Sequence, residues 1–373
     1  MIALYPFSLL ASVAPTRTAA RCRFGGGFDL PGDLVRHRVA ADWANGGLTP
    51  RQIRSRRFYP IDCRCDAALD ISRRVRTAEM MKKTPAVVEA PPKCSCGQPI
   101  ASNITSCLAC GMPVGFPNVR FAERSSERDA LNGRLKAASE SAAARGAFET
   151  LQDFGRAVQH SLTVISRHQG DLQAMLQGEG GLMQAYHPAV RAGLRVPANN
   201  AFDPARETFD SAINPTFFQD LHFGALSLDG KGVPYYGDYA ITLREDYTAN
   251  RTTVFEENPA SFRTKHPEVM LGELPLGYRA VWEERDLLAM AKLQPKIESG
   301  TPPEAFPTLL MEQQPKADGG SDFIECHVFG QIVPRTFKHV RAMVADEVVD
   351  RGIWARMAVK LDHFGVTHDE EIV

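Results

Sequence analysis

The stretch KCSCGQPIASNITSCLACG, Lys93–Gly111, decides how the chain divides, because it gathers four of the eight cysteines in one short polar segment. Cys94 and Cys96 form one pair, Cys107 and Cys110 form a second, and ten residues separate the pairs. A glycine follows each pair directly, and glycine permits the positive φ of a tight turn. Backbone N–H groups in such turns point at the thiolate sulfurs. The segment therefore predicts two metal-binding knuckles.

The four thiols predict a structural metal ion. Four thiolates at about 2.3 Å from the metal form a closed tetrahedral site, and their softness suits Zn²⁺ or iron. Such a site keeps no position for water, so we expect no metal catalysis there. The segment resembles a short zinc ribbon of the kind found near the N-terminus of many bacterial proteins. That resemblance implies an interaction or stability module over residues 92–115.

Composition bounds the class of protein. The chain has 373 residues, 44% hydrophobic and 23% charged, with a formal net charge of −1. These values are ordinary for a soluble globular protein and give no global field for nucleic acid or an acidic membrane. No apolar run approaches the roughly 18 residues of a membrane-spanning helix. Clustered cysteines fit metal binding in a reducing compartment better than disulfides, so we expect a cytoplasmic protein.

Residues 1–80 lack the sequence patterns of a folded segment. Their basic residues are all arginine, the first lysine is Lys82, and no methionine lies between Met1 and Met80. No sustained helical or strand period runs through them. Three explanations stay open: translation from a misplaced start codon, a disordered basic tail, or a targeting segment, although a signal peptide carries its positive charge before the apolar stretch.

Residues 121–177 predict a helical region. The intervening alanine-rich sequence favours helix, and Gly146 predicts a break. This region is either a partner-binding coiled coil or a helical arm packed on the C-terminal domain, and the absence of a strict heptad favours the arm. One apolar stripe at helical spacing comprises Phe148, Leu151, Phe154, Val158, Leu162 and Ile165.

Residues 186–350 predict a β-rich mixed domain, so the overall class is α+β. Alternation and turn residues predict several separated strands, and GYRAVWEERDLLAMAKLQPKI predicts a strand or turn followed by a helix. PRTFKHVRAMV predicts an ending in a short basic helix or turn. The predicted strands lie in LHFGALSL, DYAITLRE, RTTVFEEN, FPTLLMEQQ and DFIECHVFGQIV.

Two of these stretches carry a resemblance. YYGDYAITLREDYTANRTTVFEENPASF and DFIECHVFGQIV resemble segments of the ADP-ribosyltransferase-like fold. The resemblance implies NAD as a ligand and Glu325 as the catalytic glutamate, with His327 where that group usually has glutamine. It also implies that His222 holds a ribose and that Tyr235 or Tyr236 stacks on nicotinamide. A glutamate there would stabilise the oxocarbenium-like charge as nicotinamide leaves.

The sequence departs from that pattern in places. Phe323 stands where the family carries a second glutamate, and no Ser-Thr-Ser strand is present. Cys326 neighbours Glu325 in a strand and is expected to be buried on the other face. Glu256 and Glu257 are expected at a turn or on the surface. Residues 94–345 as a whole are similar to a bacterial family with a zinc ribbon, a helical middle and a β-rich end, which implies no function.

The function we expect from sequence is a zinc-ribbon binding or adaptor protein with a protein partner, and whether it is an enzyme stays open. The alternative is an ADP-ribosyltransferase-like enzyme. Nucleic acid is the weakest candidate, because Lys93 is the only basic residue from Lys93 to Gly115. No P-loop, G-x-S-x-G or H-E-x-x-H motif occurs. The transferase requires Glu325, His222 and a tyrosine to converge in one pocket.

Overall fold

The computed structural model describes residues 91–177, 181–196, 205–312 and 321–373. These described residues form one compact unit. The interpretations of residues 1–80 lie outside the described residues. Among the described residues, none of the helices is both long and apolar enough to cross a membrane.

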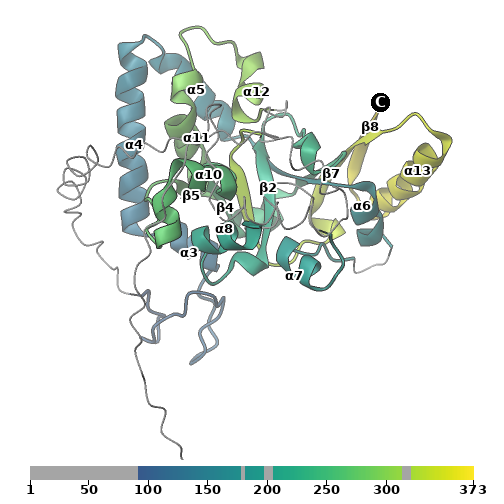
Figure 1. The fold of residues 1–373 in the computed structure, drawn as a ribbon, viewed down its shortest axis with the longest axis horizontal. Helices are drawn as coiled ribbons and strands as arrows, with labels where there is room; N and C mark the ends of the chain where they lie inside the picture. The colour runs from purple at the N-terminus through teal and green to yellow at the C-terminus, as the bar shows by residue number, and fades with distance from the viewer. Residues whose placement is uncertain (1–90, 178–180, 197–204, 313–320) are drawn as a thin grey trace, which may run out of the picture. The chain divides into compact units, whose positions relative to one another are not determined.

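One sheet of eight strands organises the unit (Figure 1). Its order is β5-β4-β6-β2-β1-β3-β7-β8, and every pairing is antiparallel except the parallel pair β7–β8. The strands are β1 (Leu162–Arg167), β2 (Leu221–Ser227), β3 (Tyr239–Leu243), β4 (Thr252–Phe255), β5 (Arg279–Val281), β6 (Glu325–Phe329), β7 (Phe337–Val344) and β8 (Thr367–Ile372).

The register assigns each residue of the central strands to one of two faces. Ala225 on β2 and Phe255 on β4 both lie opposite Glu325, and directly opposed residues share a face. His327 is two residues along β6 from Glu325 and so lies on that same face. Cys326 lies on the other face. We call the face of Glu325 the polar face and the face of Cys326 the apolar face.

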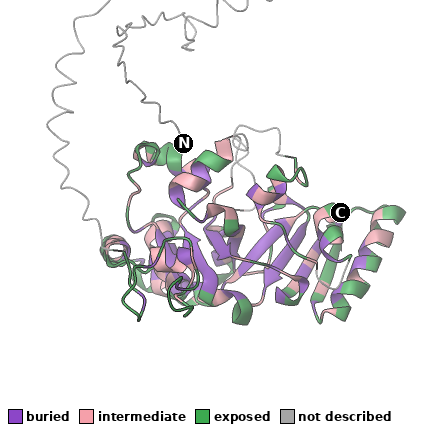
Figure 2. Cartoon of the chain, turned by 90° about the horizontal axis from the view of Figure 1, so that it is seen from below, coloured by how far each residue is buried: buried purple, intermediate pink, exposed green. Residues whose placement is uncertain are grey.

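Helices cover the apolar face at both ends of the sheet. One buried cluster joins Cys326 to Leu151 and Phe154, and it involves α4 (Ser125–Ala144), α5 (Phe148–Val158), α11 (Arg285–Leu293) and α12 (Phe306–Leu310). A second cluster joins Val328 to Trp354, and it involves α6 (Gln169–Met175) and α13 (Val348–His363). Figure 2 shows the central strands largely buried and the outer sides of the helices exposed.

Shorter helices cover part of the polar face. Ile213 on α8 (Arg206–Ile213) and Phe262 on α10 (Pro259–Lys265) pack with Phe255 of β4. Helix α7 (Tyr186–Arg191) lies beside α8, where His187 contacts Asp210. The remaining short helices are α3 (Pro117–Ala122) and α9 (Glu245–Thr248).

The predicted helical stripe is wrong at its end. Gly146, with φ +69°, separates α5 from α4, as predicted. Helix α5 ends at Val158, and the chain then enters β1. Leu162 and Ile165 therefore belong to a strand at the centre of the sheet. The run Thr163–Ile165 is β-branched throughout, which favours a strand. The helical middle region consequently contributes a strand to the sheet of the C-terminal region.

Three further expectations are corrected. The FPTLLMEQQ segment forms helix α12 up to Leu310 instead of a strand, and residues 313–320 lie outside the described residues. The PRTFKHVRAMV segment forms β7. The boundary at residue 350 falls inside α13, and β8 returns to pair with β7. The other four predicted strands, the β5–α11 sequence and the mixed class of helix and sheet are confirmed.

Glu256 and Glu257 lie in a bend directly after β4, which confirms the predicted turn, but they are not surface residues. Glu257 is buried and forms an ion pair with Lys265 at 2.6 Å. Glu256 pairs with Arg134 of α4 at 2.5 Å, and burial raises the pKa of Glu256. Arg134 lies 122 residues from Glu256 in sequence, and Lys265 lies 8 residues from Glu257, so local alternation cannot reveal these pairs.

Candidate functional site

A pocket opens on the polar face, over β1, β2 and β6. Its lining includes Glu325, Tyr236, Tyr186 and three arginines. The volume open to the centre of a water molecule is about 40 Å³. Ligand pockets commonly enclose about 300 Å³ or more, so this pocket is narrow and admits a thin or flat group.

Glu325 forms part of the pocket wall while being almost wholly buried, with 3% of its surface exposed. Burial and the neighbouring Asp210 raise the pKa of Glu325 well above its ordinary value, and Arg206 opposes this shift. Oε2 of Glu325 lies 2.9 Å from Nε2 of His327. A carboxyl group with such a raised pKa in a pocket is a candidate for chemistry.

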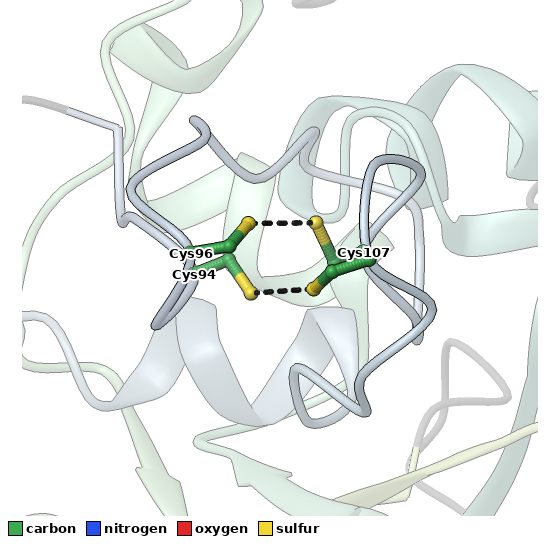
Figure 3. Close-up of side chains that lie close together, drawn as sticks. Cys94, Cys96 and Cys107 are labelled. Carbon is green, nitrogen blue, oxygen red and sulfur yellow. Dashed lines mark hydrogen bonds between the residues drawn. The ribbon is translucent and has the colours of Figure 1, made fainter.

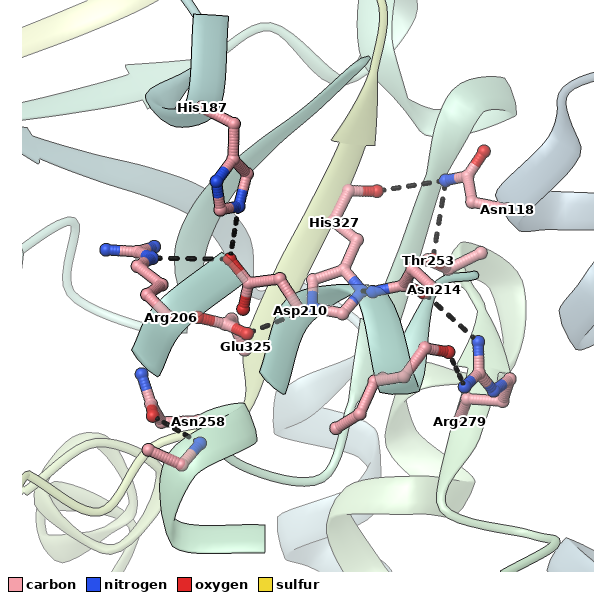
Figure 4. Close-up of polar contacts among 12 residues, drawn as sticks. Asn118, His187, Arg206, Asp210, Asn214, Thr253, Asn258, Arg279, Glu325 and His327 are labelled. Atoms are coloured by element: carbon pink, nitrogen blue, oxygen red, sulfur yellow. Dashed lines mark hydrogen bonds and ion pairs between the residues drawn. The ribbon is translucent and has the colours of Figure 1, made fainter. Parts of the chain in front are cut away.

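Two guanidinium groups, those of Arg195 and Arg206, face the same space. Arg167 also borders the pocket, but its register on β1 directs its side chain to the apolar face, where its guanidinium contacts Met183. Arg206 is held by Asp210 at 3.3 Å, and His187 holds that carboxylate at 2.8 Å from the other side (Figure 4). Loss of hydration and the positive charges of Arg195 and Arg206 lower the pKa of Arg167 to about 9. Among the described residues, Arg195 has no ion-pair partner. The pocket therefore carries excess positive charge and favours an anion.

Aromatic rings complete the walls. The guanidinium of Arg206 lies 4.1 Å from the centroid of the Tyr186 ring, and that of Arg195 lies 5.0 Å from it. On the other side, Tyr236 packs against Phe323 with ring centroids 6.3 Å apart. Flat walls of this kind offer stacking surfaces to a planar ligand.

His222 does not belong to this site. It lies opposite Val328 in the β2–β6 register, so its side chain is on the apolar face. Burial, Arg167 and Arg251 lower the pKa of His222 to about 3. The predicted convergence of Glu325, His222 and a tyrosine is therefore wrong at His222, because one step in strand position changes the face.

The two tyrosines also differ. Tyr236 lines the pocket beside Glu325, as the resemblance implied, whereas Tyr235 is 46% exposed and is absent from the lining. Their rings meet edge to face with centroids 5.3 Å apart. Of the four residues predicted for catalysis and ligand binding, the structure brings Glu325 and Tyr236 together and excludes His222 and Tyr235.

Sequence reasoning missed the arginines. Arg167 ends β1, which the helical stripe concealed, and Arg195 and Arg206 flank segments without a sequence motif. One signal was available: TVISR has the β-branched composition of a strand and ends in a cation. Cys326, in contrast, lies as expected: it is fully buried on the apolar face, and burial raises the pKa of its thiol to about 12.

The cysteine cluster forms two facing knuckles (Figure 3). Gly97 and Gly111 adopt φ of +87° and +72°, which confirms the predicted turns. The backbone N–H of Cys96 donates to the sulfur of Cys94 and lowers the pKa of Cys94 to about 6. The backbone N–H groups of Ala109 and Cys110 lower the pKa of Cys107 in the same way. The amide donors thus point at the sulfurs.

The four sulfurs lie close enough to share one ion. Sγ of Cys94 is 3.5 Å from that of Cys110, and Sγ of Cys96 is 3.7 Å from that of Cys107. All four lie within 4.8 Å of one another. Sulfurs that each lie about 2.3 Å from a tetrahedral metal would be about 3.8 Å apart, so the donor set fits such an ion.

No family model matches this chain, and no curated protein shows significant similarity to it.

Proposed function

We propose that the pocket binds NAD as a substrate and that the protein is an ADP-ribosyltransferase-like enzyme in which Glu325 is the catalytic glutamate. The observation that carries this proposal is the placement of a buried carboxyl group at the wall of a narrow pocket that also presents the guanidinium groups of Arg195 and Arg206 and two tyrosines. A dinucleotide offers the matching chemistry, because it combines a pyrophosphate, two planar rings and ribose hydroxyl groups.

Each pocket residue would have a role that follows from its chemistry. Arg195 and Arg206 would bind phosphate oxygens through charge-assisted hydrogen bonds, and Tyr236 would stack on a planar ring. Glu325 in its ionised form would accept a hydrogen bond from a ribose hydroxyl group. It would also stabilise the positive charge that develops as nicotinamide departs with the bonding electron pair.

The raised pKa of Glu325 has a consequence for this role. A carboxyl group stabilises positive charge only when it is ionised, so activity should rise with pH through the raised pKa. Arg206 favours the ionised form, because a positive charge close to a carboxyl group lowers its pKa.

The test is nicotinamide release from NAD⁺ by the full chain, beside its Glu325→Gln and Cys326→Ala variants. We expect release by the wild type, a loss of at least about 100-fold in Glu325→Gln, and near-wild-type rates in Cys326→Ala. Cys326 is the matched control because it neighbours Glu325 on the opposite face of the same strand. Absence of binding at millimolar NAD⁺ would overturn the proposal.

The cysteine cluster supports a separate proposal, a structural Zn²⁺ held by Cys94, Cys96, Cys107 and Cys110. Its closed set of four sulfurs would supply folding energy to residues 92–115 and no reactive position. The binding or adaptor function also stays a proposal for this segment. It is favoured by two apolar side chains that the ribbon exposes, Leu108 at 87% and Met112 at 55%. Capture of a partner that Leu108→Ser abolishes would support it.

A further inference from the structure

Among the described residues, His327 is the one that lies within hydrogen-bond distance of the Glu325 carboxylate. It lies two positions along β6, on the polar face, and is 1% exposed. Its ring stacks on Phe255 with centroids 5.7 Å apart and meets the edge of Phe223 at 5.2 Å. The two aromatic rings thus fix the plane of the imidazole and restrict its rotation.

The tautomer of His327 follows from its other partners. Arginine can only donate hydrogen bonds, so the atom of Asn214 that lies 3.3 Å from Nη1 of Arg279 is the amide oxygen. The amide NH₂ of Asn214 must then face Nδ1 of His327, which is 3.3 Å away. Nδ1 is therefore an acceptor. In a neutral imidazole the remaining proton is on Nε2, which donates to Oε2 of Glu325.

Arg279 is itself fixed at the far end of this chain of contacts. Its Nη2 donates to the carbonyl oxygen of Ile213 at 2.9 Å, and its Nε lies 3.3 Å from the carboxylate of Glu127. Glu127 also accepts from the backbone N–H of Gly277 at 2.7 Å. Figure 4 shows the resulting sequence of side chains from Arg279 through Asn214 and His327 to Glu325.

We propose that His327 is a positioning residue for the proposed reaction: its Nε2–H holds Oε2 of Glu325, and Asn214 and Arg279 lock the tautomer that makes this donation possible. The inference rests on the proposed function. It assigns the second carboxylate oxygen, Oε1, to the ligand. Buried polar residues commonly serve stability alone, but this series of hydrogen bonds ends at Glu325, the one carboxyl group that lines the pocket.

The arrangement also sets how the site responds to pH. The charged groups that face Glu325 and His327 are Asp210 and Arg206 from α8 and Arg279 from β5. Burial, Arg279 and Arg206 lower the pKa of His327 to about 3, so the ring stays neutral at physiological pH. Because Nε2–H bonds to the carboxylate, losing that donor should raise the pKa of Glu325 further.

The first test is independent of catalysis. Histidine labelled with ¹⁵N in the full chain should show one ring, absent from His327→Gln, as the neutral Nε2–H tautomer at pH 7 with no titration between pH 7 and pH 5. Asn214→Leu should convert that signal to a mixture of tautomers. An Nδ1–H tautomer, or a ring that titrates near pH 6.5, would overturn the proposal.

The second test separates positioning from packing. His327→Gln keeps an N–H donor, whereas His327→Phe keeps the aromatic packing and removes the donor. We expect His327→Phe to lower kcat for nicotinamide release about 10- to 100-fold with little change in KM, and to move the rising limb of the pH profile to higher pH. His327→Gln should retain most of kcat. His222→Gln, a buried histidine on the apolar face, is the matched control and should leave the profile in place.

Failure of this inference differs from failure of the proposed function. Equal kcat and equal pH profiles in His327→Phe and His327→Gln, in a protein that releases nicotinamide, would reject the positioning role alone. A wild type that binds no NAD⁺ would reject the reaction and with it a positioning role in that reaction. The tautomer measurement would then decide only whether His327 holds Glu325.

Discussion

The two faces of the sheet differ most sharply along β6. On the apolar face, Cys326 and Val328 are buried in two clusters of aliphatic and aromatic side chains. On the polar face, Glu325 and His327 are buried just as completely but among ionisable groups. Burying ionisable groups costs free energy that hydrophobic packing does not, so such groups need an explanation beyond stability. The apolar face holds the fold together, and the polar face is the candidate for chemistry.

Two histidines on neighbouring strands show the same difference between the two faces. His222 and His327 are both buried, and the pKa of each is lowered to about 3. His327 has partners at both ring nitrogens, whereas Nδ1 of His222 has no hydrogen-bond partner among the described residues. Burial and a perturbed pKa therefore do not identify a functional residue by themselves. The face of the sheet on which a residue lies and its hydrogen-bond partners identify it.

The largest effect should come from the apolar face. Phe154 of α5 is fully buried and meets Phe306 edge to face at 5.3 Å. Phe154→Ala should lower the free energy of unfolding by about 3–5 kcal/mol through lost burial and a cavity, as measured by urea denaturation. Phe148→Ala on the same helix is the control, because Phe148 is 38% exposed and should cost far less. Equal losses would contradict the assignment of this face as the core.

The next effect concerns ligand binding at the polar face. Arg195 is half-buried, and removing it orphans no buried carboxylate among the described residues. Arg195→Met should weaken NAD⁺ binding about 10- to 100-fold, which corresponds to the loss of one charge-assisted hydrogen bond. Calorimetric titration would measure this change in Kd. Arg191→Met is the control, since exposed Arg191 bonds to Gln219. An unchanged Kd in Arg195→Met would place phosphate binding elsewhere.

A smaller effect should appear in the pH dependence of stability. The folded pKa of Glu325 is raised, so between its ordinary value near 4.3 and that raised value the folded state binds more protons than the unfolded state. Stability contributed by this group is present at low pH and is lost as pH rises through the window. Glu325→Gln removes this loss.

The melting temperature of Glu325→Gln should therefore increase relative to that of the wild type as pH rises from 4 to 8. The lowered pKa values of His222 and His327 act in both proteins and cancel in the difference. Thermal melts of both proteins at matched ionic strength would measure it. A difference that is constant with pH would show that Glu325 ionises normally.

The smallest effect on the sheet should come from the ribbon. Cys107→Ser should abolish zinc binding, seen as loss of stoichiometric metal by mass spectrometry, and should unfold residues 92–115. The melting of the sheet should be nearly unchanged, because the ribbon has its own small cluster around Cys94, Ile100 and Cys107. Global unfolding of this variant would show that the ribbon and the sheet share one core.

Sequence patterns predicted what is local. The two knuckles need only residues within a span of 17 positions and two glycines with positive φ, and both turns formed as expected. Strands with a clear alternation, such as Tyr239–Leu243, were also found. The end of α5 was missed because the stripe from Phe148 to Val158 happens to continue at Leu162 and Ile165 in a strand.

The site was only half predictable for a physical reason. Glu325 and Tyr236 were identified through short sequence stretches, but the side of the sheet on which His222 lies depends on its register against β6. Arg195 lies after α7 and Arg206 begins α8, and only the folded chain brings them beside Glu325 of β6. Long-range pairing of this kind leaves no periodic signal in the chain.

The most direct measurement is a crystal structure of the Glu325→Gln variant with NAD⁺, because that variant should bind the dinucleotide without consuming it. The account predicts the nicotinamide ribose within hydrogen-bond distance of residue 325 and the phosphates against Arg195 and Arg206. A dinucleotide bound on the apolar face or against the ribbon would contradict it, as would a pocket that stays empty at saturating NAD⁺.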